Sequence, residues 1–232
     1  MRKTISAAIV LVVAYVVISS LFHYVLFPEP GPGPSDLPRS GTTIVNEGIR
    51  STFVYRQTSI ETAGRLFEWD SLVEPGGGPI ALPHRHPHLR EIFRVVDGDI
   101  RFVIDGEERV VKAGEELVAP PGSVHAFQNV SGRPVHIVSR FEPAEQGPWD
   151  DLARRGLLID SQFVQLQRVG GIGHVNILQL IVFGSRFKQG YAPTIPTSIQ
   201  DLISFLVAPT ARLFGFHAYY PPPNPRGDIV GK

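Results

Sequence analysis

Residues 78–98 of this chain read GPIALPHRHPHLREIFRVVDG, and residues 114–129 read GEELVAPPGSVHAFQN. The first stretch places His84, His86 and Glu91 between two glycines, and the second places His125 shortly after a turn that contains Gly122. Three imidazoles and one carboxylate can surround a single metal ion, and these ligand types suit first-row divalent metals. The two stretches therefore predict one metal site that folding assembles from separate segments.

The spacing of the four candidate ligands indicates how they would meet. Side chains two residues apart on a strand point to the same face, so His84 and His86 are expected to project together. Glu91 opens the next strand, and His125 comes from a later one. Three histidines and one glutamate leave two positions open on an octahedral ion, as a catalytic metal needs for water, dioxygen or a chelating substrate. Glu91 is also the candidate catalytic base, if its carboxylate swings off the metal.

Turn residues surround these ligands. Gly98 follows Asp97 in a tight turn, where a positive φ is expected. Pro120 and Gly122 shape the turn that delivers His125. Asn129 is expected to fix a nearby loop through bonds between its side chain and the backbone.

Short strands separated by turns make up the middle of the chain. We expect strands at residues 51–57, 65–73, 91–97, 100–104 and 107–112, with Asp105-Gly106 as the hairpin turn between the last two. The 23 glycines and 21 prolines of the chain favour turns and short strands over a helical bundle. A mainly β sandwich or barrel is therefore predicted for residues 42–143.

In their fixed positions, the two stretches resemble the two signature motifs of the cupin superfamily. The resemblance covers about residues 54–141 and implies a double-stranded β-helix, a jelly-roll barrel of two antiparallel sheets. It also implies that His84, His86, Glu91 and His125 ligate a metal inside the barrel. In this family the metal is commonly Fe, Mn, Ni, Zn or Cu, although some members keep the fold without a functional metal.

Two functions follow from the resemblance, because cupins include dioxygenases, oxalate-degrading enzymes, sugar isomerases and epimerases, and also non-enzymatic sensors and storage proteins. The first hypothesis is a metal-dependent oxidoreductase of dioxygenase type. Its substrate would be a small, partly apolar molecule, because the site is expected among Ile92, Phe93, Phe102, Val124 and Phe127. The second hypothesis is a non-catalytic module that binds or senses a small ligand. Dimers are common among cupins, so a homodimer is expected by analogy.

The first 27 residues differ in kind from the rest. Arg2 and Lys3 precede an uncharged apolar run from Ile5 to Phe27, long enough to cross the hydrocarbon core of a bilayer as a helix. We expect a membrane anchor with the remaining domains outside the cytoplasm, since cations at the N-terminus favour an N-in orientation. The alternative is a cleaved signal peptide, although its apolar region would be unusually long.

Residues 28–41 are interpreted as a linker, because five prolines between Pro28 and Pro38 exclude helix and central strand. Acidic and basic residues balance at 22 each, so no global charge points to nucleic acid as a partner. The chain has no cysteine, which excludes thiolate metal sites, disulfides and cysteine nucleophiles.

Residues 144–218 are predicted to form a helical extension, followed by an irregular tail at 219–232. A short helix is expected at Pro148–Arg155, a second within His174–Lys188, and a third after a capping box formed by Thr197 and Gln200. Pro209 is expected to break or bend the third helix, and Gly215 to end it. These C-terminal segments are loosely similar to helical tails of uncharacterised bacterial cupin proteins.

The other histidines are not predicted to be ligands. His88 continues the parity of His84 and His86, but it follows Pro87 and is expected to face solvent in a loop. The four others, His23, His136, His174 and His217, lack partners at ligand spacing and are interpreted as structural or surface residues.

Overall fold

A computed structural model describes residues 2–28, 39–79, 83–144, 176–188, 190–219 and 229–230 of the chain. The predicted helix at Pro148–Arg155 lies outside the described residues, as do His174 and most of the predicted linker and of the predicted tail.

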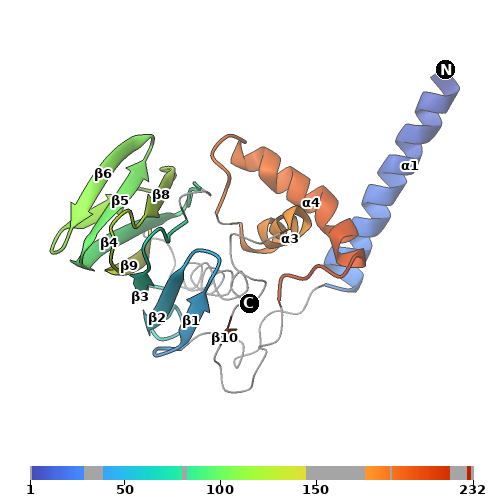
Figure 1. The fold of residues 1–232 in the computed structure, drawn as a ribbon. Coiled ribbons are helices and arrows are strands. Elements are labelled where there is room, and N and C mark those ends of the chain that lie inside the picture. Colours follow the sequence, from blue (N-terminus) through green and yellow to red (C-terminus); the bar gives the residue numbers. More distant parts are fainter. Residues whose placement is uncertain are drawn as a thin grey trace.

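The middle of the chain folds into two sheets that face each other (Figure 1). The larger sheet has the strand order β10-β1-β2-β3-β9-β4-β7, and the smaller has the order β6-β5-β8. The strands are β1 Thr43–Asn46, β2 Ser51–Gln57, β3 Phe67–Val73, β4 Leu89–Asp97, β5 Asp99–Ile104, β6 Glu107–Lys112, β7 Glu116–Ala119, β8 His125–Gln128, β9 Val135–Pro143 and β10 Ile229–Val230. The mainly β jelly roll predicted from the sequence is confirmed.

The predicted turns lie where the sequence placed them. Asp105 and Gly106 both have positive φ, at 50° and 89°, and they join β5 to β6 in the tight hairpin. Gly98 has φ 89° between β4 and β5. An added Cβ at Gly98 would come 2.8 Å from Cγ2 of Val135, so this glycine is needed for close packing as well as for its backbone conformation.

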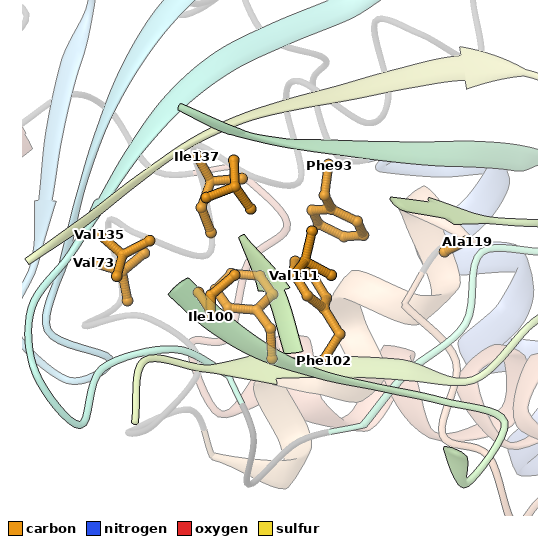
Figure 2. Close-up of a cluster of buried hydrophobic side chains, with 10 residues drawn as sticks. Val73, Phe93, Ile100, Phe102, Val111, Ala119, Val135 and Ile137 are labelled. Carbon is orange, nitrogen blue, oxygen red and sulfur yellow. The ribbon is translucent and has the colours of Figure 1, made fainter. Parts of the chain in front are cut away.

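An apolar core fills one end of the space between the sheets (Figure 2). Phe93 from β4 meets Phe102 from β5, with ring centroids 4.8 Å apart, and Phe127 from β8 packs against both. A second cluster, which includes Phe67, Trp69, Leu89 and Phe141, lies at the opposite end of the inner face of the large sheet. Strand β4 passes from one cluster to the other, with Leu89 in one and Phe93 in the other. Glu91, midway between them on the same face, is therefore held between two apolar layers.

Among the described residues, two helices follow the barrel, α3 at Ile177–Phe187 and α4 at Thr197–Leu213, and they pack on each other as a hairpin. Helix α3 starts at Asn176, whose side chain accepts a hydrogen bond from N of Leu178. Helix α4 continues through Pro209, so of the two predicted effects, a break or a bend, the break is wrong. Gly215, with φ 86°, does follow its end.

The predicted capping box at the start of α4 is wrong. Pro196 is the N-cap residue, no side chain caps the helix, and Thr197 already lies inside the first turn. The side chain of Gln200 instead bonds the loop that precedes the helix, at Ala192 and Ile195. The side chain of Gln200, which the local pattern assigned to capping, therefore bonds backbone groups outside the helix instead.

The N-terminal helix α1, Arg2–Leu21, continues into a short π-helix, η1, at Phe22–Leu26. The window Ile9–Leu26 has the length and composition of a membrane span or of a signal sequence, and none of it is buried within the protein. The C-terminal end of this helical segment lies beside α4 (Figure 1). Tyr24 of η1 stacks on Phe205 with ring centroids 5.0 Å apart, and Arg212 donates to the carbonyl of Phe27 at 3.2 Å.

Candidate metal centre

His84 and His86 lie on a three-residue segment beside β8. N of His84 donates to the carbonyl of His125 at 3.2 Å, and N of His125 donates back to the carbonyl of His84 at 2.9 Å. The carbonyl of His86 accepts from N of Gly122 at 2.9 Å. The segment thus extends the smaller sheet and directs two imidazoles toward His125, as the ring centroid separations of 4.8 Å for His84 and 5.5 Å for His86 show.

Glu91 and His125 complete the group from opposite sheets. Glu91 lies on β4 of the large sheet, and His125 begins β8 of the small one. Nε2 of His125 is 2.8 Å from Oε2 of Glu91, and Nε2 of His86 is 3.7 Å from the same oxygen. The structure therefore brings together all four residues that the two sequence stretches singled out.

The dimensions of this group suit a single ion. One ligand atom from each of the four residues lies within 4.8 Å of every other. Ligand atoms about 2.1 Å from a common ion lie roughly 3–4 Å apart, so small shifts of the side chains would close the cage. His86, Glu91 and His125 are buried, at 8%, 6% and 3% exposure, and His84 is half-buried. Within the described part of the chain, this is the one cluster of such residues that could hold a metal ion.

The charge state of His125 reflects its surroundings. Burial by itself would lower the pKa of its imidazole, but the hydrogen bond and the negative charge of Glu91 outweigh burial and raise this pKa. The other ring nitrogen, Nδ1, lies 3.2 Å from the carbonyl of Ser123, which fixes the orientation of the ring. A metal ion at this position would compete with the proton shared between His125 and Glu91.

Turn residues of both stretches hold the ligand strands in place. Gly122 has φ 80°, which allows the turn before β8 to deliver His125. The buried side chain of Asn129 donates to the carbonyls of Val73 and Arg133, each at 2.8 Å, and so ties the end of β8 to the end of β3. The loop-fixing role predicted for Asn129 is confirmed.

Two aromatic rings border the cluster, whereas Ile92, which was predicted to lie beside it, does not. Phe93 lies 6.0 Å from the ring of His125, and Phe141 lies 4.9 Å from the ring of His86. Ile92 is on the opposite face of β4 from Glu91 and Phe93, because successive strand residues alternate between faces. Its expected place beside the site is therefore wrong, whereas Phe141 is a neighbour that sequence reasoning missed.

The remaining described histidines lie apart from this cluster. His88 is exposed, as predicted for a loop residue after Pro87. His136 is 2.6 Å from a carboxylate oxygen of Asp70, His217 is exposed, and His23 contacts Arg212 next to the N-terminal helix.

Sequence reasoning also missed a segment far along the chain. Tyr191 pairs with Arg85, the residue between His84 and His86, through two backbone hydrogen bonds of 3.1 Å. Its phenol donates to Asp201 at 2.8 Å, and burial together with this carboxylate raises the pKa of Tyr191. No local sequence pattern predicts this pairing, because it joins residues more than a hundred positions apart.

Comparison with known proteins identifies the domain that holds the cluster. The family model described as "Cupin domain" matches residues 70–141, which include all four candidate ligands. Among curated proteins, none matches the chain.

Several solved structures resemble this chain over about half of its length or somewhat less. KdgF from Halomonas sp. shares 20% identity, with 42% of this chain and 82% of that chain covered and a TM-score of 0.36. An RmlC-like cupin from Shewanella frigidimarina shares 19% identity, with 51% and 95% covered and a TM-score of 0.36. A predicted oxalate decarboxylase from Thermotoga maritima shares 16% identity, with 46% and 99% covered and a TM-score of 0.40.

Proposed function

This chain belongs to the cupin superfamily by its domain at residues 70–141, and on that premise we propose that it binds one divalent transition metal through His84, His86, Glu91 and His125. The observation that carries the proposal is the convergence of three imidazoles and one carboxylate between two sheets, with three of the four side chains buried. Burying such groups is costly unless they are paired or coordinate a metal. Histidine and carboxylate ligands suit Fe, Mn, Ni, Zn and Cu alike, so the proposal covers this group of metals.

We propose further that the domain is a metal-dependent oxidoreductase of dioxygenase type, acting on a small molecule. When bound, the metal would supply a Lewis acid with open positions for dioxygen or a chelating substrate. The residues around it support a partly apolar substrate, because Phe93 and Phe141 border His125 and His86. Glu91 would hold or move a proton at Oε2, the oxygen that already lies 2.8 Å from Nε2 of His125.

A second candidate function is non-catalytic sensing of a small ligand. Its support is the connection of the cluster to the C-terminal helices, since Arg85 pairs with Tyr191 and Tyr191 bonds Asp201 on α4. The middle and the C-terminal end of α4 contact the segment that continues α1: Phe205 stacks on Tyr24 of η1, and Arg212 donates to the carbonyl of Phe27. A ligand at the cluster would thus lie at one end of a chain of contacts that reaches α1.

The metal proposal is tested by elemental analysis of protein purified without a metal-affinity column. We expect about one equivalent of divalent metal in the wild type and in His88→Ala, whose exposed side chain serves as the control. We expect little or no metal in His125→Ala. Metal content that is equal in all three proteins would contradict the assignment of the ligands.

The choice between the two functions is tested by a screen for dioxygen consumption with candidate small molecules. Turnover that is lost in Glu91→Ala supports the oxidoreductase. A tightly held small molecule that is recovered unchanged, with no oxygen consumed, supports the sensor.

We propose that α1 anchors the chain in a membrane and that the metal-binding domain lies outside the cytoplasm. The exposed apolar window at Ile9–Leu26 and the cations at Arg2 and Lys3 support this orientation. External protease applied to intact cells should digest the domain, whereas protection would contradict the orientation. The mass of the mature protein tests cleavage, since removal of a signal peptide would shorten the chain at its N-terminus.

A further inference from the structure

The segment that carries His84 and His86 has a structural neighbour on each side. On one side His84 exchanges backbone hydrogen bonds of 3.2 and 2.9 Å with His125. On the other side Arg85 exchanges two bonds of 3.1 Å with Tyr191. Successive residues of a strand direct their backbone groups to opposite neighbours, so this short segment lies between β8 and the C-terminal extension.

The backbone position of Tyr191 is in turn fixed by the first turns of α4. The phenol of Tyr191 donates to Oδ1 of Asp201 at 2.8 Å, and Tyr191 is 8% exposed. Gln200 closes the loop after Tyr191: its Oε1 accepts from N of Ala192 at 3.0 Å. Its Nε2 donates to the carbonyls of Ala192 at 2.9 Å and of Ile195 at 2.6 Å.

The same loop also reaches the side chain of Arg85. Nη2 of Arg85 donates to the carbonyl of Ile195 at 3.1 Å, so Arg85 contacts the loop through its backbone and through its guanidinium. Gln200 and Asp201, which are adjacent on α4, therefore bond a loop that contacts Arg85. Arg85 is the single residue between the candidate ligands His84 and His86.

We propose that Tyr191, Gln200 and Asp201 are positioning residues that set the placement of His84 and His86 for the metal; the inference rests on the proposed function of this cluster. The segment has prolines at 83 and 87 on either side, so it cannot form a long ladder of its own. With β8 alone it would be an edge segment held from one side. The pairing with Tyr191 restrains it from the other side, at the residue that both ligands flank.

The physical consequence is a dependence of metal affinity on residues that never touch the metal. Ligands bind best when their orientation is fixed by outer partners, and loss of such a partner typically costs 10–100-fold in affinity. On this inference the C-terminal helices contribute to metal affinity, although the family match ends at residue 141.

The test compares full-length variants by titration with Mn²⁺ and with Zn²⁺, each alone, and by hydrogen exchange at the amide of Arg85. Gln200→Ala and Asp201→Ala should each accelerate exchange at this amide and weaken metal binding by about tenfold. Ala208→Gly is the matched control: it lies on the same helix, is fully buried against α3 and lowers helix stability by about 1 kcal/mol, yet it leaves the loop contacts intact. We expect its metal affinity to match the wild type.

The outcomes separate the inference from the function on which it rests. Faster exchange at Arg85 with unchanged metal affinity would overturn the positioning role and leave the metal site standing. Failure of the wild type itself to bind either ion would overturn both. If the alanine variants do not fold, Tyr191→Phe removes only the phenol oxygen. Its metal affinity should then be several-fold below that of the wild type, and equal affinity would overturn the inference.

Discussion

Oε2 of Glu91 lies 2.8 Å from Nε2 of His125, and the two side chains come from opposite sheets of the barrel. The smaller sheet contributes the histidine and the larger sheet contributes the carboxylate, so an ion at this point would join the two layers. Binding at the cluster should therefore stabilise the fold as a whole, because an ion that binds only the folded state shifts the unfolding equilibrium.

Removal of divalent metal is predicted to lower the thermal stability of the wild type. At a free metal concentration 100 times the Kd, the bound ion adds about 2.7 kcal/mol to the free energy of unfolding. Calorimetric scans with and without a chelator measure this difference. In Glu91→Ala the two scans should coincide, and in His88→Ala the wild-type difference should remain. A chelator effect that persists in Glu91→Ala would place the stabilising ion elsewhere.

The pH dependence of stability should depend on Asp70, on the outer face of β3. Burial alone would raise the pKa of this carboxyl, but hydrogen bonds with Arg56 and His136, 2.7 and 2.6 Å away, outweigh burial and lower it. A lowered pKa in the folded state contributes stability that is present above the ordinary aspartate pKa of 3.8 and is lost as pH falls through the folded value. Asp70→Asn should cost about 1 kcal/mol near neutral pH, and this cost should shrink as pH falls below 3.8 and through the folded value.

Asp97→Asn is the control for this effect. Asp97 pairs with Arg133 at 3.1 Å, but both side chains are more than 60% exposed, so the pair should contribute little at any pH. Urea unfolding at a series of pH values compares the two variants. Equal pH profiles for both would show that the half-buried arrangement around Asp70 has no special role.

The barrel and the cluster were largely predictable from the sequence, because their determinants are local. Alternation along residues 100–104 predicted β5, and Asp105-Gly106 marked the hairpin that follows it. The spacing of His84, His86 and Glu91 implied that these residues share one interior. The positive φ at Gly98 also followed from the turn pattern alone.

The parts that sequence reasoning missed depend on contacts between distant segments. Gln200 fitted a capping box, yet its amide bonds the loop at Ala192 and Ile195, which no local pattern encodes. Tyr191 has an ordinary sequence environment, and only the fold places it beside Arg85. Ile92 was assigned to the site for its apolar character, although strand parity after Glu91 already indicated the opposite face.

Replacement of the buried Ser71 by alanine is predicted to stabilise the protein. The hydroxyl of Ser71 lies on the inner face of β3 at 1% exposure, with no hydrogen-bond partner among the residues that the structure describes. A buried hydroxyl without a partner costs free energy, so Ser71→Ala should raise the free energy of unfolding by about 1 kcal/mol. Ser123→Ala is the matched control, because the hydroxyl of Ser123 donates to the carbonyl of Pro120 at 2.8 Å.

Chemical denaturation distinguishes these two serines. Ser123→Ala should lower the free energy of unfolding by about 1 kcal/mol, the usual net contribution of one hydrogen bond. If Ser71→Ala destabilises the protein to the same extent, its hydroxyl must have a partner in solution.

Two turn glycines, one at the end of the first stretch and one in the hairpin after it, should differ in their tolerance of a methyl group. Gly98 and Gly106 share φ 89°, so alanine at either position carries the same backbone strain of about 1–2 kcal/mol. A Cβ at Gly106 meets nothing within 4 Å, whereas one at Gly98 comes 2.8 Å from Cγ2 of Val135. Gly98→Ala should therefore cost about 1–3 kcal/mol more than Gly106→Ala, the usual range for overpacking a core.

Gly78 extends the same argument to the metal cluster. At φ 112°, its added Cβ would lie 2.6 Å from the carbonyl oxygen of Phe127, a backbone atom of the strand that begins at His125. A side chain could relieve this contact by changing its rotamer, but a backbone atom cannot. Gly78→Ala should therefore displace β8, weaken metal binding and lower the free energy of unfolding. Gly114→Ala is the control, since its φ of 88° brings similar strain but its Cβ meets nothing within 4 Å. Thermal unfolding and Mn²⁺ titration of the two variants measure both effects, and equal losses in the pair would rule out a role for close packing at Gly78.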